Sequence, residues 1–203
     1  MLKKINQQSC KKVAVTGGNG FVGLHVLNHK AFHNALALGR TRPLNHPYFK
    51  KVSLTDNDGS LREVLSGIDV LVHMAGRAHV MNDQSEDPLE EFRKINTNAT
   101  LSLASQAAFA GVKRFIYIST AKVLGEYTKL GQPFRHDDPL KPGDPYSQSK
   151  AEAEVGLKLI GDSSGMEIVI IRPPLIYGKG VKGNFESLLK LVRWRIPLPF
   201  KGI

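Results

Sequence analysis

Apolar positions along the chain fall into short runs of strand length, separated by longer segments with the spacing of a helix. Strands are predicted at 13–16, 35–38, 51–54, 70–74, 115–119 and 167–172. Helices are predicted at 21–29, 60–66, 88–110 and 146–159. Because strands and helices follow one another in turn, the pattern predicts an α/β fold, a doubly wound parallel sheet of the Rossmann type.

Glycine and proline mark the boundaries of these elements. Gly111 and Gly161 are predicted to end helices, because glycine readily adopts the left-handed conformation that closes a helix. The segment 131–145, which is rich in proline, is predicted to be a surface loop rather than a domain boundary. Arg172 is interpreted only as the end of a strand.

A glycine-rich turn, T-G-G-N-G-F-V-G from 16 to 23, follows the first predicted strand. Gly17 permits a tight turn, Gly20 lets the backbone approach a pyrophosphate, and Gly23 lets the helix lie close to the strand. The N-terminus of that helix then faces the phosphates. The motif predicts a dinucleotide site, and the alternative is a turn with no ligand.

Tyr146 and Lys150 form a second pattern. They are four residues apart in a predicted helix, so both side chains lie on one face. A lysine ammonium near a phenol stabilises the phenolate and moves its pKa down from about 10, as a general base requires. The alternative is an ordinary surface contact.

Composition narrows the class of protein. The chain has 203 residues and 41% hydrophobic content, which suits one sizeable core. Its apolar runs are far shorter than the roughly 20 residues of a membrane span. Residues 1–12 lack the apolar stretch of a secretory signal, and the single Cys10 cannot form an internal disulfide. We therefore expect a soluble, cytoplasmic protein without a metal site.

The formal net charge of +10 raises the question of an anionic partner. Lysine and arginine are spread singly or in pairs, without the long basic run that is typical of nucleic-acid binding. Binding of an anionic nucleotide explains the positive charge equally well. We expect no nucleic-acid partner, and a homodimer is left open.

Together, the motifs resemble the extended short-chain dehydrogenase/reductase family, and within it the nucleotide-sugar epimerases and reductases. The resemblance rests on the glycine turn, the strand leading to Ser119 and Thr120, the pair of Tyr146 with Lys150, and the segment I-R-P-P-L-I-Y-G at 171–178. Weaker matches lie at His73, Ala75, Gly76 and Asn96. For Asn96, the interpretations are an orientation of the active-site backbone or a mere helix position.

The resemblance implies a catalytic set of Thr120, Tyr146 and Lys150. Tyr146 would take and return a proton of a sugar hydroxyl, while Lys150 would lower the pKa of Tyr146 and hold the nicotinamide ribose. Thr120 would hydrogen-bond the reacting oxygen, with Ser119 beside it; the alternative for Thr120 is a residue that caps a turn.

Further site residues follow from the same resemblance. Cofactor contacts are implied for Gly17, Gly20, Phe21, Val22, Gly23, Arg40, His73, Ala75, Gly76, Tyr146, Lys150 and Pro173. Substrate contacts are implied for Ser119, Thr120, Asn184 and Phe185. A structural imidazole is the alternative for His73, and a helix start is the alternative for Asn184.

Two departures from the family pattern are informative. NAD-preferring members carry an acid at the end of the second strand, whereas this chain has Gly39 followed by Arg40, with Arg42 nearby. A nicotinamide dinucleotide is therefore expected, with NADP favoured over NAD. Ala121 and Lys122 stand where family dehydratases place Asp-Glu, so loss of water at C6 is not expected.

The predicted organisation has three parts: an extension at 1–12, a dinucleotide-binding domain at 13–178, and the start of a truncated substrate lobe at 179–203. The predicted function is sugar-nucleotide 4-epimerisation through transient oxidation at C4 of a UDP-hexose, in surface polysaccharide biosynthesis. One alternative is an NADPH-dependent 4-ketoreductase. The other is a non-catalytic NADP-binding module.

Overall fold

The fold is built on a single sheet of six parallel strands. The computed structural model describes residues 11–56, 59–78, 85–181 and 184–194. The strands lie in the order β3-β2-β1-β4-β5-β6, so the direction of winding reverses between β1 and β4. Their bounds are β1 Val13–Thr16, β2 Leu36–Gly39, β3 Phe49–Lys51, β4 Val70–His73, β5 Arg114–Ile118 and β6 Glu167–Ile171. The predicted doubly wound Rossmann-type sheet is confirmed.

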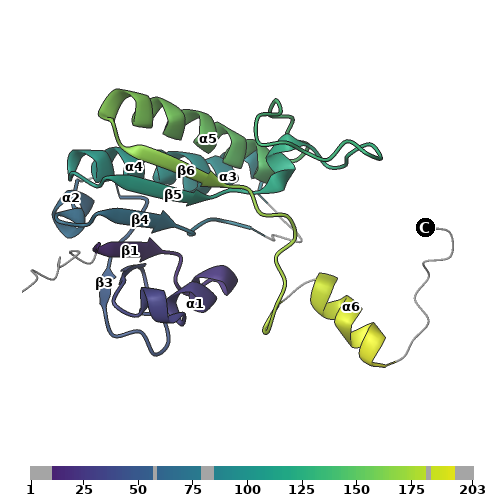
Figure 1. Cartoon of the computed structure of the whole chain (residues 1–203), viewed down its shortest axis with the longest axis horizontal. Helices are drawn as coiled ribbons and strands as arrows, with labels where there is room; N and C mark the ends of the chain where they lie inside the picture. Colours follow the sequence, from purple (N-terminus) through teal and green to yellow (C-terminus); the bar gives the residue numbers. More distant parts are fainter. Residues whose placement is uncertain (1–10, 57–58, 79–84, 182–183, 195–203) are drawn as a thin grey trace, which may run out of the picture.

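Helices cover both faces of the sheet (Figure 1). On one face lie α2 (Leu61–Leu65), α4 (Ala99–Phe109) and α5 (Pro145–Ser164), and on the other lies α1 (Phe21–Leu27) with the 3-10 turn η1 (Lys30–Phe32). Neighbouring residues of each strand point to opposite faces: Ala14 and Leu71 enter the core under α4 and α5, while Val15 and Val72 face α1. This alternation fixes the sheet between its two layers.

Two sequence predictions about element bounds are wrong, and the structure refines a third, whose helical span of 88–109 agrees with the prediction. The third strand ends at Lys51 rather than beginning there, although Val52 and Leu54 still pack against the core from the loop that follows. The predicted helix 88–110 is divided into α3 (Pro88–Phe92), a π-helical stretch η2 (Arg93–Asn98) and α4. Gly161 lies inside α5, which ends at Gly165 with φ of 75°. A Cβ at Gly161 would lie 2.7 Å from Ile168, so this glycine allows α5 to approach β6.

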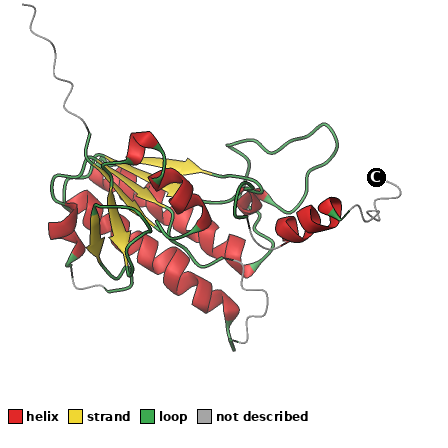
Figure 2. Ribbon diagram, turned by 90° about the horizontal axis from the view of Figure 1, so that it is seen from below, coloured by secondary structure: helices red, strands yellow, loops and turns green. Residues whose placement is uncertain are grey.

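The last described helix, α6 (Asn184–Arg193), stands apart from the sheet in both views (Figures 1 and 2). Its Leu189 and Val192 side chains are 42% and 53% exposed, and Trp194 just beyond it is 70% exposed. These side chains of α6 therefore contribute little to the core that fixes the described part of the chain.

Three further features concern the start of the chain, membrane-spanning helices and metal-binding clusters. Cys10 and most of the predicted extension at 1–12 lie outside the described residues. Within the described part, no helix is both long and apolar enough to cross a membrane. The same part contains no cluster of three His, Cys, Asp or Glu side chains that could hold a metal ion.

Candidate active site

The glycine-rich turn joins β1 to α1 at the carboxyl edge of the sheet, next to the winding reversal. Gly17 has φ of 73°, and a Cβ there would lie 2.5 Å from the Ala75 nitrogen. A Cβ at Gly23 would lie 2.1 Å from the Gly17 carbonyl oxygen. Gly20 begins α1 without any side-chain cap on its N-terminal N–H groups. The turn is therefore a bare backbone cradle of the kind that fits a pyrophosphate.

Asn96 fixes the segment that follows β4. Its Oδ1 accepts from the Arg77 amide at 2.8 Å, while its Nδ2 donates to the Arg77 carbonyl and to Ser149 Oγ, both at 3.1 Å. A Cβ at Gly76 would lie 3.1 Å from Asn96 Oδ1. Asn96 lies in the π-helical stretch η2, where the added residue per turn displaces the side chain from ordinary helical register. It thus orients this backbone, as the first interpretation predicts.

His73, at the end of β4, is buried among polar groups. One ring nitrogen lies 2.6 Å from Thr16 Oγ1 and the other lies 2.9 Å from Thr100 Oγ1. The imidazole stacks on the Tyr117 ring at 5.8 Å between centroids. Burial, with a smaller effect of Lys150, lowers the pKa of His73 to about 3, so the ring is neutral. Both nitrogens are therefore engaged within the chain, as the structural interpretation of His73 requires.

Lys150 is the most buried cation of the site. Helix α5 starts with a capping box of Asp144 and Ser147, and this start places Lys150 in the second turn, facing the sheet. Its Nζ donates to the Ile118 carbonyl at 2.9 Å and lies 4.3 Å from the centroid of the Tyr117 ring. Burial lowers the pKa of Lys150 to about 8, while Glu154 opposes this shift.

Tyr146 lies one turn earlier on α5 and packs edge-on against Phe92, with 5.9 Å between ring centroids. Burial and the nearby Asp144 carboxylate raise the pKa of the Tyr146 phenol above 10.0. The direction is opposite to the lowering expected from Lys150. Here the Lys150 ammonium is bonded to the Ile118 carbonyl.

Ser119 and Thr120 follow β5 and are fastened to the segment after β6. The amides of Ser119 and Ala121 donate to the carbonyls of Ile171 and Pro173, at 2.8 and 2.9 Å. The Ser119 Oγ is buried and has no hydrogen-bond partner among the described residues. Thr120 Oγ1 accepts from the Lys122 amide at 3.3 Å, which is the capping role, and its own hydroxyl proton is left to donate.

An ion pair joins this segment to α5. Lys122, two residues after Thr120, pairs with Asp144, two residues before Tyr146. The structure therefore brings the three predicted catalytic residues to one edge of the sheet.

The two arginines after β2 have different environments. Arg42 donates to the Pro47 carbonyl at 3.0 Å and lies over the Phe49 ring. Asn19 in the glycine turn donates to the backbone carbonyl and Oγ1 of Thr41, at 2.8 and 2.9 Å. Arg40 is exposed and makes no hydrogen bond or ion pair with the described part of the chain. Of the two cations, Arg40 is the one available to a ligand.

A hollow of about 360 Å³ lies between α1 and the chain after β6. It contains Phe21 and Val22 of the predicted cofactor set, together with Tyr177 and Gly178. Phe185 stacks on Tyr177 with 5.2 Å between ring centroids. Phe185 therefore lies beside this hollow, which does not include Tyr146. The side chain of Asn184 lies outside the described part.

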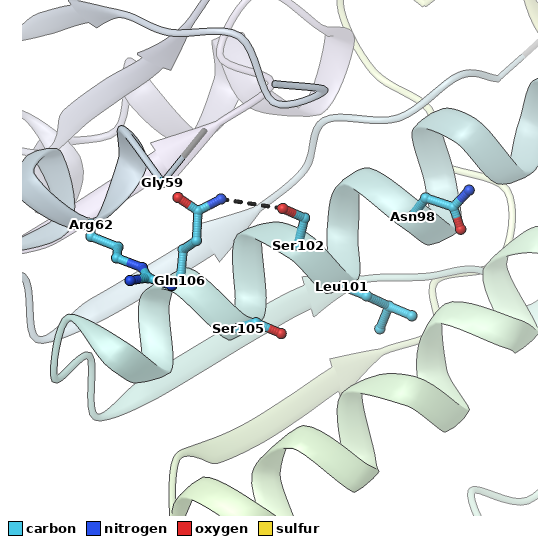
Figure 3. Close-up of a pocket in the computed structure, with 7 residues that line it drawn as sticks. All are labelled: Gly59, Arg62, Asn98, Leu101, Ser102, Ser105 and Gln106. Atoms are coloured by element: carbon cyan, nitrogen blue, oxygen red, sulfur yellow. Dashed lines mark hydrogen bonds between the residues drawn. The ribbon is translucent and has the colours of Figure 1, made fainter. Parts of the chain in front are cut away.

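A second hollow, of about 440 Å³, lies between α2 and α4 (Figure 3). Its lining includes Arg62, Ser102 and Gln106, and it contains none of the predicted site residues. It is therefore separate from the candidate active site.

Several residues that hold the site together were not predicted. Asp144 carries a local signal, because an Asp three residues before Ser147 and next to Pro145 is typical of a helix start. Asn19, Thr100, Glu154 and the side chain of Arg172 act through partners far away in sequence, which no local pattern reveals.

Comparison with known proteins places this geometry in a family. A sequence profile described as "NAD dependent epimerase/dehydratase family" matches residues 13–195. UDP-glucose 4-epimerase of Vibrio cholerae is 42% identical over 209 residues, covering 95% of this chain and 60% of the relative. The chain thus spans only 60% of the length of that protein.

Two solved structures are also similar. The dTDP-glucose 4,6-dehydratase DesIV of Streptomyces venezuelae, with NAD bound, is 27% identical with a TM-score of 0.69, over 79% of this chain and 55% of DesIV. MoeE5 in complex with UDP-glucose and NAD is 27% identical with a TM-score of 0.73, over 89% and 60% of the two chains. With the sheet order, the glycine turn and the profile match in agreement, this chain belongs to the NAD-dependent epimerase/dehydratase family, within the short-chain dehydrogenases/reductases.

Proposed function

We propose that the chain carries the dinucleotide-binding and catalytic half of a sugar-nucleotide 4-epimerase that acts at C4 of a UDP-hexose. The observation that carries the proposal is the placement of Tyr146 and the buried Lys150 on one face of α5, beside Gly76 and the Ser119 to Thr120 segment. The 42% identity to a UDP-glucose 4-epimerase supports the same reaction.

The residues at the carboxyl edge of the sheet fit a nicotinamide dinucleotide. The pyrophosphate would lie on the bare backbone of Gly17, Gly20 and the start of α1, where a side chain would obstruct it. Gly76 and Pro173 would border the nicotinamide end. The nicotinamide, when bound, accepts a hydride from C4 and returns it.

Proton transfer is assigned to Tyr146. Its raised pKa keeps the phenol protonated in this structure, so it needs a nearby cation to act as a base. The Lys150 ammonium, one turn away on the same face, supplies that cation when it turns from the Ile118 carbonyl towards the phenol. Thr120 would donate its hydroxyl proton to the reacting sugar oxygen, and Ser119 beside it would contact the same substrate.

The form of the cofactor is a finer question. No carboxylate follows β2, and Arg40 is exposed at a position where a ribose 2′-phosphate could meet it, which favours NADP. A Cβ at Gly39 would meet nothing within 4 Å, so there is room for a phosphate. The similar structures named above contain NAD, which favours the other form.

Two other functions compete with epimerisation. A 4-ketoreductase would use the same residues with net consumption of NADPH, and Arg40 favours it. A binding module without catalysis would need neither Tyr146 nor Lys150, so their placement argues against it. Dehydration at C6 is disfavoured, because Lys122 is held by Asp144 and Ala121 offers no acid.

A mixing experiment separates these functions. The chain is incubated with NAD or NADP and with UDP-glucose or UDP-galactose, and in a second mixture with NADPH and a UDP-4-keto-hexose. The sugars are followed by NMR and the cofactor by absorbance. Appearance of the C4 epimer without net change in the cofactor supports epimerisation. Net oxidation of NADPH with a 4-keto sugar supports reduction, and binding without either reaction supports the binding module.

Turnover by the 203-residue chain is expected to be slow. A protein of the length of the Vibrio relative has further residues that can contact the sugar and the nucleotide, and such contacts position C4 for hydride transfer. Dinucleotide binding by this chain should be measurable even when turnover is weak.

A further inference from the structure

A largely buried ion pair lies beneath the candidate active site: the Glu154 side chain is 0% exposed and the Arg172 side chain is 14% exposed. Glu154, one turn after Lys150 on α5, has no exposed surface and contacts Arg172 just after β6. Arg172 Nη2 lies 2.7 Å from Glu154 Oε2, and Arg172 Nε lies 3.1 and 3.2 Å from the two carboxylate oxygens. The guanidinium and the carboxylate therefore meet in the bidentate arrangement that fixes orientation as well as distance.

Arg172 connects α5 to the segment that carries Ser119 and Thr120. Its two chain neighbours, Ile171 and Pro173, accept hydrogen bonds from the amides of Ser119 and Ala121. The backbone of Thr120 is thus bracketed by two hydrogen bonds to residues on either side of Arg172. Because Ile171 and Pro173 flank Arg172, fixing the position of Arg172 also fixes the position of the backbone around Thr120.

The same guanidinium reaches a third segment. Arg172 Nη1 donates to the His136 carbonyl at 2.9 Å, within the loop that leads to Asp144 and the start of α5. That loop is also bound to the Thr120 side of the site, since the Lys141 amide donates to the Val123 carbonyl at 2.8 Å. One side chain therefore links α5, the strand ends of β5 and β6, and the loop before Tyr146.

Another ion pair on α5 provides a contrast. Glu152 accepts from Arg93 Nε and Nη2 at 2.9 and 2.7 Å, with side chains that remain 27% and 38% exposed. It has the same bidentate geometry and joins α5 to η2. Among the described residues, this pair has no hydrogen bond or ion pair to the segment 119–121 or to the loop at 136.

Burying an ion pair is a poor way to gain stability. Removing both charges from water costs about as much as their attraction returns, so well-packed apolar side chains often serve a core equally well. The position of this pair suggests a different benefit. We propose that the pair of Glu154 with Arg172 is a positioning device that aligns Thr120 with Tyr146 and Lys150. The proposal rests on the proposed function for its meaning, but its geometry is testable without turnover.

Amide hydrogen exchange tests the alignment directly. In Glu154→Gln, exchange at Ser119 and Ala121 should quicken by about tenfold or more, because the hydrogen bonds to Ile171 and Pro173 lose their anchor. Glu152→Gln is the matched control and should leave both amides within about twofold of the parent chain. Arg172→Lys keeps a cation for Glu154 but lacks the planar fork, so it should repeat the effect if Glu154→Gln fails to fold.

A double variant separates positioning from stability. Glu154→Leu with Arg172→Met replaces the pair by apolar side chains and should melt near the parent temperature. Rapid exchange at Ser119 and Ala121 in this folded variant supports the proposal, and parental protection there overturns it. Unchanged protection in Glu154→Gln or Arg172→Lys overturns it as well.

The link to catalysis has its own measurement. Hydride transfer should slow by about ten- to a hundredfold in Glu154→Gln, while the dinucleotide dissociation constant stays within about twofold, because alignment rather than binding is lost. Failure of the parent chain to bind any nicotinamide dinucleotide would refute the proposed function and leave the exchange result standing. Equal losses in binding and transfer would refute positioning.

Discussion

Helices α5 and α6 show two ways in which this chain uses a helix. Helix α5 lies against the sheet, starts with a capping box, and buries polar as well as apolar side chains, Lys150 and Glu154 among them. Helix α6 stands away from the sheet with Leu189 and Val192 partly exposed (Figure 1). Its charged residues form the surface pair of Glu186 with Lys190 at 2.9 Å.

The difference teaches where the chemistry of this chain is determined. The groups assigned to proton transfer are fixed by α5, by the ends of β4 to β6, and by buried hydrogen bonds between them. Helix α6 and the Tyr177 to Phe185 stack offer side chains that the core does not immobilise. We therefore expect substitutions in α5 to act on stability and chemistry. Substitutions in α6, apart from the predicted substrate contacts Asn184 and Phe185 at its start, should act strongly on neither.

The largest contrast concerns matched leucines. Leu157 in α5 is fully buried, whereas Leu189 in α6 is 42% exposed. Leu157→Ala should destabilise the fold by about 2–5 kcal/mol, because it removes apolar contacts and leaves a cavity. Leu189→Ala should cost less than about 1 kcal/mol. Urea unfolding of the two variants measures both changes in the free energy of unfolding. Equal changes would contradict the proposed difference between α5 and α6.

The sequence predicts the sheet better than the connections between its elements. For five of the six strands, both predicted ends lie within one residue of the observed ends. The agreement arises because buried parallel strands are continuous apolar runs. The third strand is predicted at 51–54 but lies at Phe49–Lys51. The apolar Val52 and Leu54, which suggest a strand, pack against the core from the loop that follows. Gly161 resembles a helix end, but its role depends on the nearness of Ile168, which only the fold establishes.

The candidate site shows the same division. Tyr146, Lys150 and the glycine turn are recognisable from local spacing. The supporting residues are not: Asn96 works through Arg77 and Ser149, and Glu154 works through Arg172, all at long sequence separation. The raised pKa of Tyr146 is not predictable from spacing either, because burial of the phenol and the approach of the Asp144 carboxylate are properties of the packed site.

The pH dependence of stability sharpens the contrast through Lys150. Its folded pKa of about 8 lies below the ordinary 10.5, so between these values the unfolded chain holds a proton that the folded chain has released. Stability from this group therefore rises with pH across that window, with a slope of up to about 1.4 kcal/mol per pH unit. Denaturation at pH values inside the window should show this rise in the parent chain and not in Lys150→Met. The same pH dependence of stability in the parent chain and in Lys150→Met would contradict the lowered pKa of Lys150.

The helix starts provide a smaller contrast. Asp144 accepts from the Ser147 amide at 2.6 Å and pairs with Lys122, so Asp144→Ala should cost about 0.5–2 kcal/mol. Glu186→Ala in α6 removes one exposed pair and should cost about 0.5 kcal/mol or less. Thermal unfolding of both variants checks the ranking, and a greater loss in Glu186→Ala would reverse it.

The smallest expected effect lies outside both helices, at Arg40. NADP(H) is predicted to bind more tightly than NAD(H), and Arg40→Ala should narrow that difference by about fivefold, since one exposed ionic contact is lost. Arg42→Ala is the control, because Arg42 is engaged with Pro47 and Phe49. Calorimetric titration that gives equal or tighter NAD(H) binding to the parent chain would contradict the NADP preference.

The most direct test of the central claim is the transient reduction of bound nicotinamide when a UDP-hexose is added, followed by absorbance in single-turnover experiments. Tyr146→Phe should slow this step by about a hundredfold or more while dinucleotide affinity is nearly unchanged, because only the proton-transfer group is lost. Tyr127→Phe is the control, since the Tyr127 side chain is 84% exposed, and it should match the parent chain. Reduction in Tyr146→Phe at the parental rate would show that Tyr146 is a structural phenol and that the assignment of catalysis to α5 is wrong.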